Sequence, residues 1–220
     1  MIYFPLSCGA YQWEPFTPDS INALTVCFDA GWPYVVGTTK GLLINDGPSY
    51  SWISYNYNLP VWDIIPDIDS SGVFFLVMGN GSYSDGIYKF YLSTHTYRVI
   101  EWVINPTFIK FNPLNHTYYV GTRFNGLKTS SDGYSWTDVG YFNGKAAAAM
   151  DIYNNHICVV QENNTFATFY SNDTGRTWQQ SSSLNPFHDI AFNSEGKLYG
   201  IFTGLSNSSG LYSSNNYGET

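Results

Sequence analysis

Short hydrophobic runs alternate with polar turns along nearly the whole chain. The runs are rich in Tyr, Val, Phe and Ile, and most are four to six residues long, which is typical of β-strands. No window of useful length shows a helical period, and residues 146–150 are the only segment that could form a helical turn. The pattern therefore predicts an all-β protein.

The runs recur as a repeating unit of strand, polar turn, strand, glycine-containing turn and third strand. Three copies can be read, at residues 25–42, 108–127 and 190–212. Trp52, Trp136 and Trp178 mark a fourth strand, with 84 residues between the first two and 42 between the last two. The copy missing between them is the degenerate segment 62–103. Four antiparallel strands per ~40-residue unit are typical of a propeller blade.

The spacing predicts one domain, a five-bladed β-propeller of four-stranded antiparallel blades. The expected blades span about residues 21–60, 61–103, 104–144, 145–184, and 185–220 together with 1–19. In this arrangement Ala10-Tyr-Gln-Trp13 supplies the outer strand of the last blade, because Trp13 precedes Trp52 by 39 residues. Such closure would join the two termini in one sheet and leave the ring no open seam.

The amino-acid composition limits the classes of partner that the chain can bind. Aromatic residues make up 19% of the chain and charged residues 12%, so a large core is expected beneath a surface of Ser, Thr, Asn, Tyr and Gly. The net charge is −8 with nine cations, which cannot form a basic patch, so we expect no nucleic-acid partner. The longest apolar run, near residues 73–78, is too short to span a bilayer, and the N-terminus lacks the pattern of a signal peptide.

The segment Ser171-Asn-Asp-Thr-Gly-Arg-Thr-Trp178 is a tight turn followed by tryptophan, and weaker copies recur with the repeat. It matches the pattern Ser-x-Asp-x-Gly-x-Thr-Trp and therefore resembles the Asp-box, or BNR, repeat. The segment 129–136 keeps Gly133 and Trp136 but has Ser131 at the Asp position, and 214–220 has Asn216 there. The defined positions of the best copy are Ser171, Asp173, Gly175, Thr177 and Trp178.

We interpret the residues of this motif as structural. Ser and Asp side chains accept backbone N–H bonds in a turn, Gly takes a positive φ, and Trp buries a large apolar area between blades. The resemblance to sialidases, xyloglucanases, sortilin-type receptors, photosystem assembly factors and several lectins implies that the motif lies at the blade periphery, away from any active site.

Candidate ligand-binding residues lie instead where the innermost strands begin. Aligned by repeat, two of the five units carry an aromatic residue followed by Asp: Trp62-Asp63 and His188-Asp189. We expect all four at the mouth of the central channel, where an aromatic platform beside carboxylates suits a sugar or another polyol. The alternative is that Asp63 and Asp189 bond to the backbone of neighbouring blades and close the ring.

Catalysis and metal binding are weaker interpretations. A glycosidase needs two facing carboxylates, which Asp63 and Asp189 could supply, with Asp151 near another inner strand. Sialidase-like chemistry implies an arginine cluster, and Arg123 alone is placed for one. Asp67-Ile-Asp-Ser-Ser-Gly72 resembles the start of a calcium loop but lacks the later Glu, so an ordinary turn is expected. We therefore predict no metal, no cofactor and no catalytic set.

Three cysteines, Cys8, Cys27 and Cys158, allow one disulfide at most, and the sequence does not say which. Cys27 and Cys158 lie within strand-like runs, where a buried thiol is expected. Taken together, the sequence predicts a non-catalytic extracellular or virion-surface module that binds glycans or a protein partner. A glycoside hydrolase and a structural assembly scaffold remain alternatives, since fold alone does not separate them.

Overall fold

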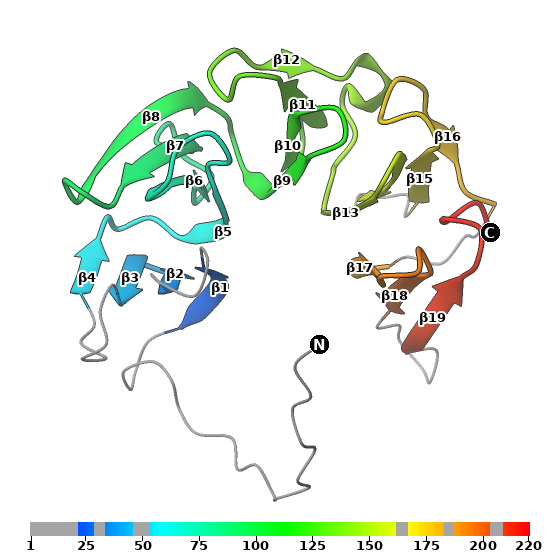
Figure 1. Cartoon of the computed structure of the whole chain (residues 1–220), viewed down its shortest axis with the longest axis horizontal. Coiled ribbons are helices and arrows are strands. Elements are labelled where there is room, and N and C mark those ends of the chain that lie inside the picture. The colour runs from blue at the N-terminus through cyan, green and yellow to red at the C-terminus, as the bar shows by residue number, and fades with distance from the viewer. Residues whose placement is uncertain (1–21, 29–33, 46–52, 162–166, 183–186, 203–208) are drawn as a thin grey trace, which may run out of the picture.

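The protein is all-β, with five antiparallel sheets that follow one another in chain order around a central space (Figure 1). The computed structural model describes residues 22–28, 34–45, 53–161, 167–182, 187–202 and 209–220. Within these ranges one short 3-10 helix, η1 (Gly140–Phe142), interrupts the strands. Five sheets agree with the five predicted blades.

Each sheet is a meander whose strands follow chain order. The first sheet contains β1 (Ala23–Phe28), β2 (Tyr34–Thr38), β3 (Gly41–Asn45) and β4 (Ile53–Asn56). The second contains β5 (Val61–Pro66), β6 (Val73–Met78), β7 (Gly86–Tyr91) and β8 (Thr96–Trp102). The third contains β9 (Pro106–Asn112), β10 (Thr117–Thr122), β11 (Leu127–Ser130) and β12 (Thr137–Asp138).

The fourth sheet contains β13 (Ala149–Tyr153), β14 (His156–Gln161), β15 (Ala167–Ser171) and β16 (Gln179–Gln180). The fifth contains β17 (Asp189–Phe192), β18 (Leu198–Phe202) and β19 (Gly210–Ser214). The fifth sheet thus has three strands among the described residues. The strand expected at Ala10–Trp13 to complete it lies outside those residues.

The first strand of every sheet lies nearest the centre (Figure 1). Consecutive inner strands contact one another from β1 to β5, β9, β13 and β17. The segment 146–150, where a helical turn was conceivable, instead leads into the inner strand β13. The helix propensity of the alanines in this segment is overridden by its place in the repeat, because an inner strand is needed there to pair with β14.

The core is divided among the spaces between sheets. One apolar cluster joins the first and second sheets, and further clusters join the second to the third, the third to the fourth and the fourth to the fifth. Strands such as β6 are buried on both faces, with Phe74 and Phe75 fully buried on opposite sides. This explains why the middle strands read as continuous apolar runs.

Cys27 and Cys158 are buried, as the sequence predicts, and Cys8 lies outside the described residues. Burial raises the pKa of the Cys158 thiol far above its ordinary value, and Asp151 adds to the shift. The Cys158 Sγ donates to the carbonyl of Tyr217 at 3.0 Å. Cys158 is therefore an unreactive packing residue. Among the described residues, the chain forms no helix with the length and apolar character needed to cross a membrane.

Candidate functional site at the centre of the sheets

The innermost strands of all five sheets surround a central cavity of about 530 Å³. Trp62, Asp63, His188 and Asp189 all line it, so the structure brings together the four residues that the sequence singled out. Lys110 and Asp151 add a cation and a further carboxylate to the same wall. Whether the cavity binds a ligand stays a prediction.

A β-bulge turns a side chain toward this cavity in three of the sheets. The register of the inner strand skips Leu24 in β1, Trp62 in β5 and Thr107 in β9. All three bulged residues line the central cavity. An extra residue in one strand bends the strand and re-aims its side chain, so the bulges give the cavity a wall that regular strands would not present.

Two rings contribute to the wall. Trp62 is 43% exposed, and its indole Nε1 donates to the carbonyl of Gly79 at 2.7 Å, which fixes the ring while leaving a face open. His188 is half-buried, and its ring lies nearly parallel to that of Phe202 at 6.4 Å between centroids. A fixed, partly exposed indole is a ready stacking surface.

The carboxylate of Asp63 links three sheets. Its Oδ1 accepts from the hydroxyl of Thr25 at 3.3 Å and from the N–H of Ile64 at 2.9 Å. Its Oδ2 accepts from the N–H of Ile109 at 3.1 Å and lies 3.8 Å from the Lys110 ammonium. Asp63 therefore matches the alternative interpretation, in which the acid bonds to the backbone of a neighbouring blade.

Asp189 is the counterpart of Asp63 but is bonded differently. Its Oδ1 accepts from the N–H of Ile190 at 2.9 Å, as Asp63 does from the residue after it, yet the Asp189 side chain is exposed and no bond to another sheet is seen among the described residues. Asp151 takes the bridging role in its place, accepting from the N–H of Phe192 at 2.6 Å. The Asp189 carboxylate can therefore accept hydrogen bonds from a ligand.

A second cavity of about 320 Å³ opens beside the first and shares Trp62, Thr107 and Ala148 with it. Its other lining residues are Gly79, Asn80, Asn105, Pro106 and Arg123. The sequence points to Arg123 only as part of an arginine cluster, and it does not predict Asn80 or Asn105 as site residues. All three lie in loops at the strand ends near Trp62, so aligning the loops as well as the inner strands would have found them.

Asp85 holds the loops of this second cavity in place. It is buried, and its carboxylate accepts the backbone N–H groups of Asn80, Gly81, Ser82 and Asn105 at 2.8 to 3.1 Å. Four N–H donors satisfy a buried charge that would otherwise be costly. The positions of Asn80 and Asn105 are therefore fixed in advance of any ligand.

The turn at 171–178 is closed by its own side chains. The Ser171 hydroxyl accepts from the N–H of Gly175 at 2.8 Å and donates to Asp173 at 2.8 Å. Asp173 also accepts from the N–H and the hydroxyl of Thr177, at 2.9 and 2.6 Å. Gly175 has φ +84°, a region that side chains disfavour. Burial raises the pKa of Asp173, but the bonds from Thr177 and Ser171 outweigh it and hold the pKa below its ordinary value.

The turn before Trp136 corrects the sequence alignment. Asp132, not Ser131, occupies the acid position, because this copy is one residue shorter. Asp132 accepts from the Ser130 hydroxyl at 2.9 Å and from the N–H groups of Tyr134 and Ser135 at 2.8 and 2.7 Å. These bonds, led by that from Ser135, hold the pKa of Asp132 well below its ordinary value. Gly133 has φ +70° and donates its N–H to Ser130.

The two motif tryptophans pack between sheets. Trp178 is buried in the cluster that joins the third and fourth sheets, edge-on to the Phe142 ring at 4.9 Å, and its Nε1 donates to the Gly175 carbonyl at 3.0 Å. Trp136 is half-buried against the cluster of the second and third sheets, and its Nε1 is buried with no hydrogen-bond partner among the described residues.

Asp67 is used in the core rather than in a calcium loop. Its carboxylate lies 2.9 Å from the Lys89 ammonium, with both side chains under 5% exposed, and accepts from the Tyr118 hydroxyl and the N–H of Asp69. Burial lowers the pKa of Lys89, but the hydrogen bonds and charge interactions with Asp67 and Tyr134 together outweigh this and raise the pKa. No group of three His, Cys, Asp or Glu side chains that could hold a metal ion is found in the described ranges.

The sequence matches no protein-family model and no curated protein. Solved structures do resemble the fold. The extracellular domain of the putative one-component system BT4673 from B. thetaiotaomicron has a TM-score of 0.71 at 15% identity, covering 92% of this chain and 28% of that one. The GH74 xyloglucanase from Xanthomonas campestris has a TM-score of 0.70 at 16% identity, with 92% and 38% covered.

PorZ, a bacterial surface component of the type-IX secretion system of Porphyromonas gingivalis, has a TM-score of 0.66 at 13% identity, covering 90% of this chain and 33% of that one. The chain thus spans only part of the length of these three structures: 28% of the extracellular domain, 38% of the xyloglucanase and 33% of PorZ. At such identities the likeness shows a β-propeller-like fold.

Proposed function

We propose that the chain is a non-catalytic recognition module that binds a glycan at the central cavity. The observation that carries this is Trp62, whose indole is fixed by its bond to Gly79 and partly exposed where the two cavities meet. The C–H face of a sugar stacks on such a ring, and the sugar hydroxyls can bond to Asp189 and to the amides of Asn80 and Asn105. His188 lines the same cavity from the fifth sheet.

The bonding of Asp63 argues against catalysis by the Asp63–Asp189 pair. A catalytic carboxylate must protonate a leaving group, attack the sugar or activate a water, and Asp63 already accepts three hydrogen bonds and faces Lys110. We assign Asp63 to holding the sheets together and Asp189 to ligand contact. A protein partner presenting an aromatic or polar loop to the same cavity is the alternative within this class.

A glycoside hydrolase remains the second candidate, because Asp151 and Asp189 line the same cavity as Trp62. In this reading Asp189 would be the acid or the nucleophile, and Asp151 would have to release the N–H of Phe192. Incubating a bound oligosaccharide with the protein and measuring new reducing ends separates the two: we expect none above the rate of an Asp189→Asn variant.

The turns at 171–178, 129–136 and 214–220 are, in this proposal, Asp-box turns of a closed five-bladed ring spanning residues 1–220. The fifth sheet supports closure: β19 has no outer strand among the described residues, and Ile201 and Leu211, paired on one face, are 48% and 68% exposed. Closure by residues 10–13, which lie outside the described part of the chain, stays a proposal. A scaffold role would use the same exposed face for another protein.

We place the module outside the cell or on a cell or virion surface. Its support is that the similar structures include an extracellular domain and a bacterial surface component. The low proportion of charged residues and the polar, Asn- and Tyr-rich composition fit that setting.

A glycan array tests the proposal. The wild-type chain is expected to bind a restricted set of oligosaccharides, and Trp62→Ala is expected to lose about five- to thirtyfold in affinity, because one stacked ring contributes roughly 1–2 kcal/mol. Tyr97→Ala removes an aromatic ring that is similarly exposed, at 47%, from the outer strand β8, away from both cavities, and serves as the matched control. No binding at high protein concentration, or equal binding by Trp62→Ala, would contradict it.

A further inference from the structure

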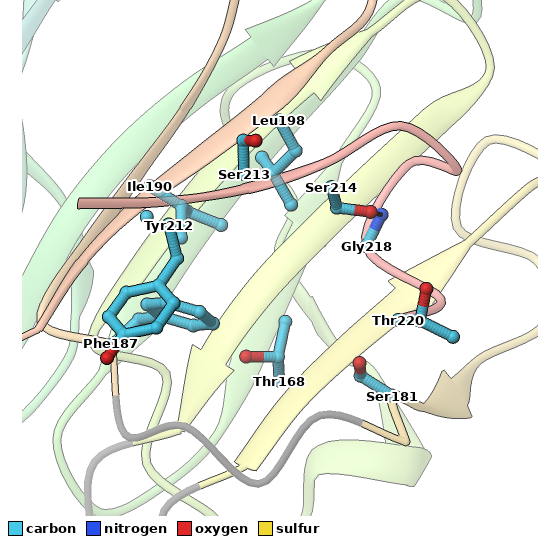
Figure 2. A pocket seen from close by; sticks show the side chains of 11 residues that line it. Thr168, Ser181, Phe187, Ile190, Leu198, Tyr212, Ser213, Ser214, Gly218 and Thr220 are labelled. Carbon is cyan, nitrogen blue, oxygen red and sulfur yellow. Dashed lines mark hydrogen bonds between the residues drawn. The ribbon is translucent and has the colours of Figure 1, made fainter. Parts of the chain in front are cut away.

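The cavities differ in the charge of the side chains that line them. In the second cavity Arg123 is the one charged side chain among the described residues, whereas the central cavity beside it is lined by three aspartates and Lys110. A further cavity of about 120 Å³, between the fourth and fifth sheets, has hydroxyl and apolar side chains but no charged one among the described residues that line it (Figure 2). The site at Trp62 therefore has a cationic side and an acidic side.

The guanidinium of Arg123 is available to a ligand. The side chain is exposed, and it forms no ion pair and no hydrogen bond within the described ranges. Other cations are paired: Lys110 lies 3.8 Å from Asp63, and Lys128 lies 2.9 Å from Asp138. A guanidinium presents its N–H donors in one plane and can bind a carboxylate through two parallel bonds. Arg123 can therefore bind an acidic group without giving up a bond inside the protein.

The backbone that carries Arg123 is held by bonds on both sides of the residue. The N–H of Arg123 donates to the carbonyl of Asn105 at 2.9 Å. The Thr122 hydroxyl accepts from the N–H of Asn125 at 2.8 Å and donates to the carbonyl of Gly126 at 3.0 Å. Gly126 has φ +85°, which side chains disfavour. The start of the arginine side chain is therefore fixed before a ligand binds, which lowers the entropy cost of binding.

Two amides add donors to the same cavity. The side chains of Asn80 and Asn105 form no hydrogen bond in the described part of the chain, while their backbone N–H groups are both held by Asp85, at 2.8 and 2.9 Å. Asp85 is 1% exposed, and its charge is satisfied by four N–H groups, so it does not need Arg123 as a partner. The second cavity thus offers donors from three side chains and no acidic side chain among its described lining residues.

We propose that the glycan bound at this site carries a single acidic group, a carboxylate or a sulfate ester, which binds Arg123 in the second cavity. The inference rests on the proposed glycan-binding function and adds the charge and the orientation of the ligand. The two cavities share Trp62, so the sugar that carries the acid stacks on this ring and its neutral neighbours extend toward Asp189. A second acidic group would meet the carboxylates of the central cavity, so a chain of contiguous acidic sugars is disfavoured.

The acidic group must be recognised locally. The net charge of the chain is −8, so an anion gains no long-range attraction to the protein as a whole. Any preference for an acidic sugar over its neutral counterpart should therefore depend on Arg123 itself.

Three monosaccharide probes test the proposal: methyl β-D-glucuronide, methyl β-D-glucoside, and the sulfate ester of the glucoside at its primary hydroxyl. They share one ring and differ only in the group that would meet Arg123. In titrations followed by protein NMR, we expect at least one of the two acidic probes to bind about tenfold more tightly than the glucoside, because charge-assisted hydrogen bonds are stronger than neutral ones. The acidic probe that binds more tightly shows whether a carboxylate or a sulfate is the natural group.

Matched arginine variants assign the preference to Arg123. In Arg123→Gln the ratio of the two affinities, acidic over neutral, should fall to about one, and in Arg123→Lys it should be intermediate, because the charge stays but the paired donors are lost. Arg98→Gln removes the same charge from an exposed position on β8, outside the lining of both cavities, and should keep the wild-type ratio. Thermal midpoints of all three variants should match wild type, since these side chains are exposed.

Equal binding of the three probes, no binding of any of them, or a preference unchanged in Arg123→Gln would overturn the inference. So would an array on which polyanionic chains bind more tightly than oligosaccharides with one acidic group. If neutral oligosaccharides alone bind on the array and lose affinity in Trp62→Ala, the glycan-binding proposal stands and this inference fails. An array without any bound glycan would overturn both.

Discussion

At the scale of single residues, the same amino acid serves different purposes in equivalent places. Asp63 and Asp189 both accept the N–H of the following isoleucine, but within the described ranges only Asp63 also bonds to the sheets on either side. The sequence predicts that both acids reach the channel. It does not separate their roles, because the partner N–H of Ile109 lies 46 residues from Asp63 and depends on how two sheets pack.

Because their hydrogen bonds differ, replacing Asp63 and replacing Asp189 should lower the free energy of unfolding by different amounts. Asp63→Ala should lower the free energy of unfolding by about 1–3 kcal/mol, because the buried N–H of Ile109 loses its acceptor. Asp189→Ala should change it by less than about 0.5 kcal/mol, because the side chain is exposed. Urea denaturation of both variants measures this. Equal losses would show that Asp189 also bonds to another sheet.

Asp173 makes the free energy of unfolding depend on pH in the acid range. Its folded pKa lies below its ordinary value, so its contribution is present above the unfolded pKa of about 3.9 and is lost as pH falls through the folded pKa. Asp173→Asn should reduce this loss while keeping the turn, because Asn216 accepts the N–H of Thr220 in the same way in the fifth sheet. Thermal midpoints from pH 7 to pH 2 check this; parallel curves for the two proteins would contradict it.

At the scale of elements, the repeat predicts the sheets better than their turns. Strand positions follow from apolar runs, because those runs are buried on both faces. The turn before Trp136 was misaligned because one residue is missing between Ser130 and Gly133, and side-chain bonds to Asp132 keep its shape despite that loss. The 3-10 helix η1 has no periodic signal, since it contributes only Phe142 to the core.

The motif tryptophan is expected to matter through packing. Trp178→Ala should lower the free energy of unfolding by about 3–5 kcal/mol, because it leaves a cavity between two sheets and an unpaired Gly175 carbonyl. Trp136→Ala should cost less, since that ring is half-buried and its N–H already lacks a partner. Chemical denaturation at neutral pH compares them, and the reverse order would contradict the packing argument.

At the scale of the whole molecule, the arrangement of sheets brings together the residues that line the two cavities of the candidate site. No single strand carries it: Trp62 and Asp63 come from the second sheet, His188 and Asp189 from the fifth, and Arg123 and Asn105 from loops of the third. Inner-strand alignment was enough to predict the first four. The loop residues could not be predicted that way, because Asp85 fixes their positions through bonds that cross between loops.

The structure of the chain bound to an oligosaccharide selected on the array decides whether the central cavity binds glycans. We expect a sugar ring stacked on Trp62, with its hydroxyls in hydrogen-bond contact with Asp189 or with the Asn80 and Asn105 amides. A ligand bound instead at the outer strands or at the turns near Trp136 and Trp178, with the central cavity unoccupied, would contradict it.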